Sequence, residues 1–195
     1  MVYRHPNFSK GVMTSYYSRL PLLEKAPDFN DDSTSESRAS VAILVRSDDH
    51  ICMIRRAVKE QDYWSGHMGF PGGREEARDD TLLQTAIRET EEEIGVHVVS
   101  EQCVGRLSDL KHPKLQVAAY VFKVESDLTF VLEESEVAEV HWLPLRAFTD
   151  SSYRGTRTAT YKGQQYEAPV VNIGTADVWG ISLRFIEDLL RRLES

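Results

Sequence analysis

The segment from Asp80 to Ile94 constrains the fold most, because it has the spacing of an amphipathic helix and lies between glycine-containing turns. Its inward-facing residues recur three and four positions apart, as one helix face requires. They are Leu83, Ala86, Ile87, Thr90 and Ile94. We expect Asp79 or Asp80 to provide the N-cap and Gly95 to end the helix. The helix therefore separates the strand-like runs before it from those after it.

Short runs of alternating apolar residues predict strands on both sides of this helix. The earlier runs are Ala39–Arg46 and Ile51–Arg56, joined by a hairpin turn over residues 47–50. The later runs are Gln102–Leu107, Leu115–Val124, Val137–Leu143, Ala159–Lys162 and Gln165–Val171, the last two flanking a Gly-Gln turn. An amphipathic helix is expected from about Asp177 to Leu193. Mixed strands with helices before and after them favour an α/β sandwich of the α+β type over a doubly wound sheet.

The chain has 195 residues, which fits one domain with short extensions. Residues 1–38 are predicted to be an N-terminal leader with weak helical spacing, followed by a polar linker rich in Asp and Ser. One domain is then predicted over residues 39–195. The leader could cap this domain or contribute a dimer contact, and the pattern favours neither.

Composition narrows the class of partner. The formal net charge is −8, whereas binding to a nucleic-acid backbone needs a basic face. No apolar run of about 18 residues occurs, so no membrane span is expected, and the N-terminus lacks the pattern of a secretory signal. Cys52 and Cys103 stand singly, as buried thiols of a reducing compartment do. We expect a cytoplasmic protein that binds a small molecule.

Carboxylates crowd one face of the predicted helix. Glu89 is three residues before Glu92 and four before Glu93, so all three project from the same side. Their mutual repulsion would be relieved by Mg²⁺ or Mn²⁺, which prefer carboxylate oxygens. Glu91 points roughly 100° away from its neighbours along the helix and is predicted to be solvated. Arg88 can pair with Glu92 four residues later. A charged face exposed to solvent is the alternative for this pattern.

The turn before the helix favours the metal site. Pro71, Gly72 and Gly73 end a long loop, and glycine lets the backbone come close to a ligand. A solvated helix face would not need such a turn.

The segment resembles the Nudix box, G-x5-E-x7-R-E-U-x-E-E-x-G-U, in which U is a bulky apolar residue. Gly73 and the run from Arg88 to Val96 match it, with Thr90 at the first U. The stretch between them is one residue longer than the consensus, and Asp79 or Asp80 replaces the early Glu. The resemblance implies an α/β/α sandwich with a mixed sheet. It also implies hydrolysis of a nucleoside diphosphate linked to another group.

A second segment is similar to the coenzyme A pyrophosphatase branch of that family, which shows L-L-T-x-R-S-x3-R-x3-G-x3-F-P-G-G. Gly66 and the run from Phe70 to Gly73 match in register, but Asp62 replaces the Arg expected four residues before Gly66. The resemblance implies cleavage of CoA, or of a CoA derivative, to 3′,5′-ADP and 4′-phosphopantetheine. Asp62 favours the alternative substrates, which are ADP-ribose, NADH, a nucleotide sugar or a nucleoside triphosphate. A non-catalytic module would usually have lost box carboxylates, and all three are present.

The resemblance also implies roles for these residues. Glu89 and Glu93 would be direct ligands of Mg²⁺ or Mn²⁺, Glu92 would be a ligand directly or through water, and the Gly73 carbonyl would complete the set. A general base must lie within reach of the attacking water. The candidates are Glu92 and Glu136, with Glu133 and Glu134 as alternatives near Glu136. Arg88 is predicted to hold Glu92 in place.

The candidates for substrate binding precede the helix. Arg55 and Arg56 end a strand that faces the long loop and could contact phosphate, although exposed strand-end charges are the alternative. His67 could contact the ligand or brace the loop. Gly72 and Phe70 complete the predicted set. Trp142 and Trp179 are expected to pack in the interior rather than to stack on a base.

Overall fold

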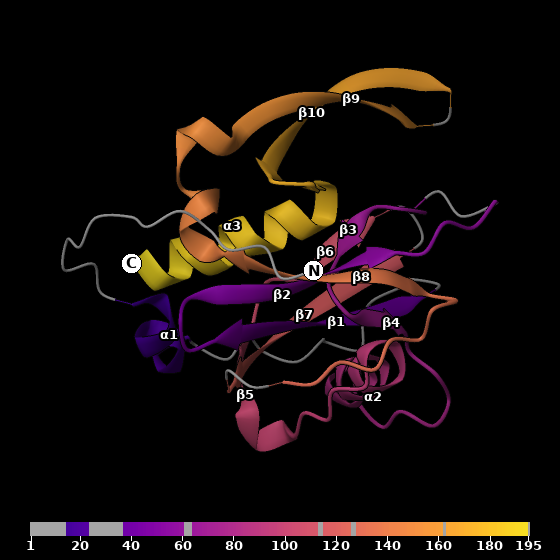
Figure 1. The fold of residues 1–195 in the computed structure, drawn as a ribbon. Helices are drawn as coiled ribbons and strands as arrows, with labels where there is room; N and C mark the ends of the chain where they lie inside the picture. The colour runs from indigo at the N-terminus through magenta and orange to yellow at the C-terminus, as the bar shows by residue number, and fades with distance from the viewer. Residues whose placement is uncertain are drawn as a thin grey trace.

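The computed structural model describes residues 15–23, 37–60, 64–112, 115–125, 128–161 and 163–194. Within these residues an eight-stranded mixed sheet lies between two helices (Figure 1). The hydrogen-bonded path through the sheet is β3–β2–β1–β7–β5, and β4, β6 and β8 pair with β1, β7 and β2. The strands are β1 (Arg38–Arg46), β2 (His50–Arg56), β3 (Met68–Gly69), β4 (Gly72–Arg74), β5 (Cys103–Arg106), β6 (Leu110–His112), β7 (Leu115–Val124) and β8 (Val137–Pro144). The predicted sandwich with a mixed sheet is confirmed.

Strand β1 forms the centre of the sheet and runs parallel to β7, whereas its other neighbours are antiparallel. Its apolar residues alternate between two cores. Ile43 and Val45 face the C-terminal helix, and Ala42 and Leu44 face the carboxylate-bearing helix. A strand buried on both faces has a nearly continuous apolar sequence, as β1 does.

Helix α2 (Leu82–Ile94) carries the carboxylates and covers one face of the sheet. The predicted N-cap, Asp79 or Asp80, is wrong: the hydroxyl of Thr81 accepts the backbone N–H of Gln84 at 3.2 Å. The Asp79 carboxylate instead accepts hydrogen bonds from the side chains of Thr85 and Arg88. Gly95 ends the helix with a φ of 68°, as expected for a glycine C-cap.

Helix α3 (Gly180–Glu194) covers the opposite face through Leu183, Phe185, Ile186 and Leu189. Its predicted start near Asp177 is wrong, since residues 176–179 form strand β11 (Ala176–Trp179). Gly180 has a φ of 62°, a conformation that favours glycine and allows the chain to turn from strand to helix.

Strand β11 pairs with β10 (Gln164–Ile173), which pairs with β9 (Arg154–Tyr161) to form a second, three-stranded sheet. The β9–β10 hairpin projects beyond α3 (Figure 1). Both strands are longer than predicted. Five short helices complete the described chain: α1 (Tyr16–Arg19), η1 (Leu20–Leu22), η2 (Ser100–Gln102), η3 (Leu145–Phe148) and η4 (Ser151–Tyr153).

The described part of the leader packs against the domain. Leu20 is fully buried, and Asp49 accepts hydrogen bonds from the hydroxyl of Ser15 and the N–H of Tyr17, both at 2.7 Å. The rest of the leader, most of the linker and Asp62 lie outside the described residues. Cys52 is buried and Cys103 half-buried, and neither forms a disulfide. Among the described residues, no helix is both long enough and apolar enough to span a membrane.

Candidate active site

Strand β4 brings the backbone against α2 and β1 at the edge of the sheet. A Cβ atom on Gly73 would lie 2.4 Å from Oε1 of Glu89, and one on Gly72 would lie 2.3 Å from the carbonyl oxygen of Ser40. Gly72 also has a φ of 153°. Only glycine permits both approaches, because a side chain would collide with backbone or carboxylate. These two close approaches explain why glycine occupies both positions of the predicted Gly-Gly turn.

Glu93 is the most buried acid of the helix, with 2% of its surface exposed. One of its oxygens accepts the N–H of Gly72 at 2.9 Å. Burial raises its pKa to about 8, the charges of Glu89 and Glu136 add to the rise, and Gly72 and Arg56 oppose it. Glu93 therefore lies in a site where its negative charge is poorly compensated.

Glu89 lies one turn earlier and is also largely buried. Burial raises its pKa, as do the charges of Glu92 and Glu136, while the Arg88 guanidinium lowers it. Nη1 of Arg88 donates to Glu89 at 2.9 Å. Glu89 and Glu93 thus form a partly neutralised pair beside β4.

Arg88 links most of the acids in this region. It donates to both oxygens of Asp79 at 2.9 and 2.8 Å and to Glu92 at 2.8 Å, besides its bond to Glu89. The predicted pairing of Arg88 with Glu92 is confirmed. Of the two candidates for the early acid of the box, Asp79 contacts Arg88 and has a side chain only 3% exposed, whereas Asp80 is exposed. The Arg88 guanidinium holds the pKa of Asp79 well below its usual range.

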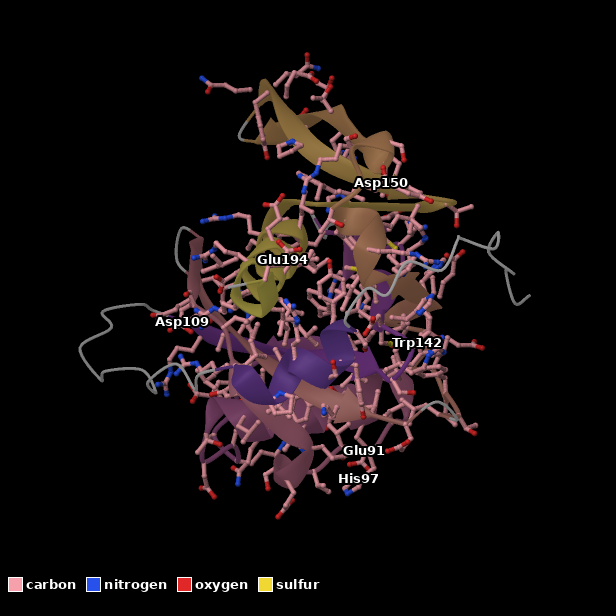
Figure 2. The ribbon with its side chains drawn as sticks, turned by 90° about the vertical axis from the view of Figure 1, so that its left-hand side faces the viewer. Glu91, His97, Asp109, Trp142, Asp150 and Glu194 are labelled. Atoms are coloured by element: carbon pink, nitrogen blue, oxygen red, sulfur yellow. The ribbon has the colours of Figure 1, made fainter. Side chains whose placement is uncertain are left out.

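Glu92 is about half exposed, and Nη2 of Arg78 lies 2.8 Å from its second oxygen. Glu91 points away from this group, as predicted: its side chain is 57% exposed and lies 3.2 Å from Nδ1 of His97. Figure 2 shows Glu91 and His97 together at the outer end of the molecule. Three of the four helix acids therefore lie on the β4 side of α2.

Glu136 precedes β8 and reaches the same region from a loop. Its carbonyl accepts the N–H of Ala57 at 2.8 Å, and its half-exposed side chain lies 3.9 Å from Nζ of Lys59. It is close enough to raise the pKa of both Glu89 and Glu93. Glu133 and Glu134, the alternatives, are exposed.

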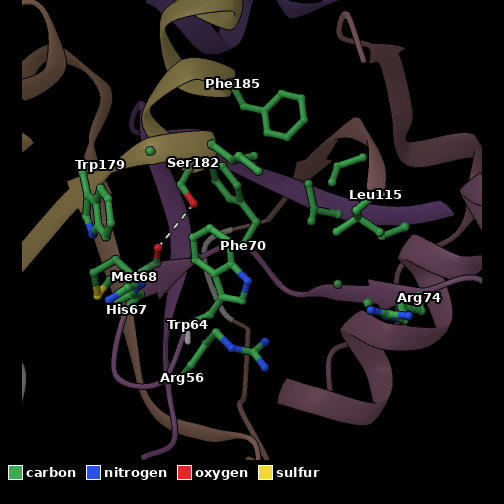
Figure 3. Close-up of a pocket in the computed structure, with 18 residues that line it drawn as sticks. Arg56, Trp64, His67, Met68, Phe70, Arg74, Leu115, Trp179, Ser182 and Phe185 are labelled. Atoms are coloured by element: carbon green, nitrogen blue, oxygen red, sulfur yellow. Dashed lines mark hydrogen bonds between the residues drawn. The ribbon is translucent and has the colours of Figure 1, made fainter. Parts of the chain in front are cut away.

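A cavity of about 280 Å³ opens on the other side of β4, between the sheet and the start of α3 (Figure 3). Aromatic and aliphatic side chains form most of its lining, among them Trp64, Phe70, Trp179 and Phe185. The cations Arg56 and Arg74 also line it. Gly72 and Gly73 belong both to this cavity and to the carboxylate cluster, so the two meet at β4.

Four of the five predicted substrate-binding residues line the cavity: Arg56, His67, Phe70 and Gly72. The fifth does not. Arg55 donates to Glu139 and to two backbone carbonyls outside the cavity. Trp179 is buried, as predicted, but it also forms part of the cavity lining.

The lining residues that the sequence reasoning missed include Arg74 and Trp64. The signal for Arg74 was a basic residue directly after the Gly-Gly turn. Trp64 lies in the segment before that turn, but its residue type alone does not separate a binding role from packing.

Among the described residues, no group of three or more His, Cys, Asp or Glu side chains converges closely enough to hold a metal ion. Glu89 and Glu92 are drawn to Arg88, and Glu93 is turned to the Gly72 N–H. The donors nevertheless fit a hard divalent cation in kind, since they are carboxylates, two of them with raised pKa. A cation bound by Glu89 and Glu92 would have to replace Arg88 as the partner of the oxygens that it now contacts.

Comparisons with known proteins identify the family and the fold of the chain. The family model described as the NUDIX domain matches residues 36–161. The chain is 24% identical over 190 residues to the Nudix hydrolase NudL of Yersinia enterocolitica, covering 93% of each chain. It is 35% identical over 112 residues to an uncharacterised Schizosaccharomyces pombe protein, covering 53% of this chain and only 34% of that one.

Two solved structures share the fold. The MutT protein of Methanosarcina mazei superposes with a TM-score of 0.56 at 17% identity, covering 82% of this chain and 96% of that one. A MutT/nudix family protein of Enterococcus faecalis gives a TM-score of 0.53 at 16% identity, covering 88% and 66%. At these identities the likeness extends to the fold alone.

Proposed function

The chain belongs to the Nudix hydrolase family, and we propose that it hydrolyses the diphosphate linkage of coenzyme A or of a CoA derivative. The products would be 3′,5′-ADP and 4′-phosphopantetheine. The observation that carries the proposal is the meeting of two features at β4. Glu89 and Glu93 press against Gly73 and Gly72 on one side of this strand. The apolar cavity with its two arginines opens on the other.

The proposed metal ligands are the carboxylates of Glu89, Glu92 and Glu93 and the carbonyl of Gly73. Members of the family generally use a divalent metal, and we propose Mg²⁺ or Mn²⁺ for this chain. When bound, such an ion neutralises charge on the diphosphate and lowers the pKa of a water molecule. Binding is supported by the charge balance of the site, because Glu93 has a raised pKa and the nearest compensating groups are a backbone N–H and Arg56.

Glu92 and Glu136 remain the candidates for the general base. Both side chains are 44–48% exposed and can reach water, whereas Glu93 is buried. Arg88 restrains Glu92 through a 2.8 Å hydrogen bond, which suits a base that must keep one orientation. Glu136 is held less tightly, with Lys59 at 3.9 Å.

Arg56 is the best-placed residue for substrate phosphate. It lines the cavity, and its charge acts on the buried carboxylate of Glu93. Arg74 is the second cation of the lining. A guanidinium group between the cavity and the carboxylates can bind phosphate oxygens there. Phe70 and His67 would then contact the part of the substrate that enters the cavity.

The second candidate function is the same hydrolysis with ADP-ribose, NADH, a nucleotide sugar or a nucleoside triphosphate as substrate. It is favoured by Asp62, which stands where the CoA branch has Arg. A non-catalytic binding module is disfavoured by the presence of all three box carboxylates, each on the β4 side of α2.

A substrate panel with Mg²⁺ or Mn²⁺ tests both functions through the products formed. CoA should yield 3′,5′-ADP and 4′-phosphopantetheine, identified by mass spectrometry. Rapid turnover of ADP-ribose without turnover of CoA would refute the CoA assignment and leave the diphosphatase assignment standing. No turnover of any diphosphate with either ion would refute both.

A further inference from the structure

One side of the cavity is an aromatic wall made of three rings, Trp64, His67 and Trp179. The rings come from two segments far apart in the sequence: the turn before β3 and the end of β11. The His67 ring lies 6.0 Å from the Trp64 ring and 5.0 Å from the Trp179 ring, edge to face in both cases. The shape of this wall therefore depends on what holds the two segments together.

The β9–β10 hairpin reaches this wall from outside the cavity through Arg157. The guanidinium carbon of Arg157 lies 4.4 Å from the centre of the Trp179 ring, at a distance typical of a cation–π contact. Arg157 also forms an ion pair with Asp177, two residues before the tryptophan. It does not belong to the cavity lining. Arg157 thus fixes both the ring and the strand that carries it.

Arg55 links the same strand to the turn that carries the other two rings. Nη1 donates to the carbonyl of Gly66 at 3.3 Å, between Trp64 and His67 in that turn. Nη2 donates to the carbonyl of Thr175 at 2.8 Å, directly before β11. Nη1 also lies 3.8 Å from Asp177. Both wall segments are therefore bound to one guanidinium group.

The side chain of Arg55 is itself anchored in the main sheet. Nε donates to Glu139 of β8 at 2.9 Å, and that carboxylate also lies 2.7 Å from Nε2 of His141. These contacts give the arginine a fixed orientation on the sheet, so that the wall is tied to the sheet on one side and to the hairpin on the other.

We propose that the network of Arg55, Asp177 and Arg157 positions the aromatic wall and thereby selects the group that enters the cavity. The mainly apolar and aromatic lining favours an apolar or aromatic group attached to the diphosphate. Arg55 and Arg157 are positioning residues, since they act through the wall rather than on the substrate. The selection of substrate rests on the proposed diphosphatase function, whereas the positioning of the wall does not.

Kinetics of Arg157→Ala and Arg157→Lys test the selection. The two substrates of the panel with the highest kcat/KM are compared, because they differ in the group outside the diphosphate. Arg157→Ala should change the ratio of their KM values roughly three-fold or more. Their kcat values should stay within about two-fold of wild type, and Arg157→Lys, which keeps the cation, should restore the ratio.

Arg154→Ala is the matched control, since Arg154 lies on the same strand but pairs with Glu187 of α3 at 2.8 Å. It should leave the KM ratio at the wild-type value. If Arg157→Ala lowered kcat equally for the two substrates and left the ratio of their KM values unchanged, the proposed selection would be overturned.

The positioning of the wall has a readout that needs no activity. The chain has three tryptophans, so Trp64→Phe combined with Trp142→Phe leaves Trp179 as the single tryptophan, which can be excited selectively at a wavelength that tyrosine does not absorb. In that background Arg157→Ala should shift the emission to longer wavelength and increase quenching by acrylamide, whereas Arg154→Ala should do neither. Unchanged emission and quenching in Arg157→Ala would overturn the proposal even if diphosphates are hydrolysed. A shift without hydrolysis of any diphosphate would refute the proposed function and leave the positioning in place.

Discussion

Replacing Glu93 by Gln should stabilise the metal-free protein while abolishing its activity. In the metal-free site Glu93 is buried, and its pKa is raised from 4.5 to about 8. The folded state therefore favours the protonated, neutral acid. Gln is neutral at every pH and similar in shape, and its side-chain oxygen can still accept the Gly72 N–H. The variant removes the unfavourable charge but also a proposed metal ligand.

The sign and size of the effect follow from proton linkage. Between pH 4.5 and about 8 the unfolded chain has lost the Glu93 proton and the folded chain has kept it. The free energy of unfolding then falls as pH rises, by about 1.4 kcal/mol per pH unit. At pH 7 the difference amounts to roughly 3 kcal/mol, or about 6–12 °C in Tm for a chain of this size.

Thermal unfolding followed by circular dichroism in EDTA at pH 5 and pH 7.5 measures this difference. The gain in Tm of Glu93→Gln over wild type should be small at pH 5 and large at pH 7.5. Addition of Mg²⁺ should raise the Tm of wild type and not that of the variant. Glu91→Gln, on the exposed side of the same helix, should change the Tm at pH 7.5 far less than Glu93→Gln does. A Glu93→Gln protein that is less stable than wild type at pH 7.5 would refute the reasoning.

Three further results are expected. Glu92→Gln should lower kcat by a factor of about 100 or more, as expected for a lost base or ligand, while Glu91→Gln should leave it nearly unchanged; equal losses in a steady-state assay would disprove the assignment of the helix faces. Gly73→Ala should lower kcat/KM strongly, because its Cβ would lie 2.4 Å from the Glu89 carboxylate, and wild-type kinetics would exclude the close approach. Asp79→Asn should destabilise the protein by about 2 kcal/mol in urea unfolding at pH 7, since it leaves a buried guanidinium without its main charge partner. That contribution should decline progressively once pH falls below the ordinary range of an aspartate, because the Asp79 pKa is lowered on folding and the group is protonated first in the unfolded chain.

The carboxylate face of α2 could be predicted because it depends only on helical geometry. Glu89, Glu92 and Glu93 share a side whatever the helix packs against, and Glu91 cannot join them. The strands beside the helix were also predictable from their apolar runs. The spacing of residues along the chain was sufficient to predict an element where that element keeps one helical or strand repeat over its whole length.

The errors arise where tertiary contacts decide between local alternatives. Asp79 has a side chain suited to an N-cap, but Arg88, nine residues later, takes it, and Thr81 caps the helix instead. The apolar spacing of α3 extends back over residues 176–179, which form a strand because β10 offers them backbone partners. The left-handed conformation of Gly180 marks the change and is not visible in an apolar pattern.

The two adjacent arginines Arg55 and Arg56 separate what the sequence can predict from what depends on tertiary contacts. Successive residues of a strand point to opposite faces, and the pairing of β2 with β8 is irregular between Arg55 and Arg56, so the two side chains meet different partners. The sequence identifies two cations near the site, but the choice between them depends on which acids approach from other elements. Glu139 of β8 and Asp177 of β11 engage Arg55, while Arg56 remains within electrostatic reach of Glu93 and lines the cavity. One arginine can therefore serve the phosphate groups, and its neighbour can hold the wall beside them.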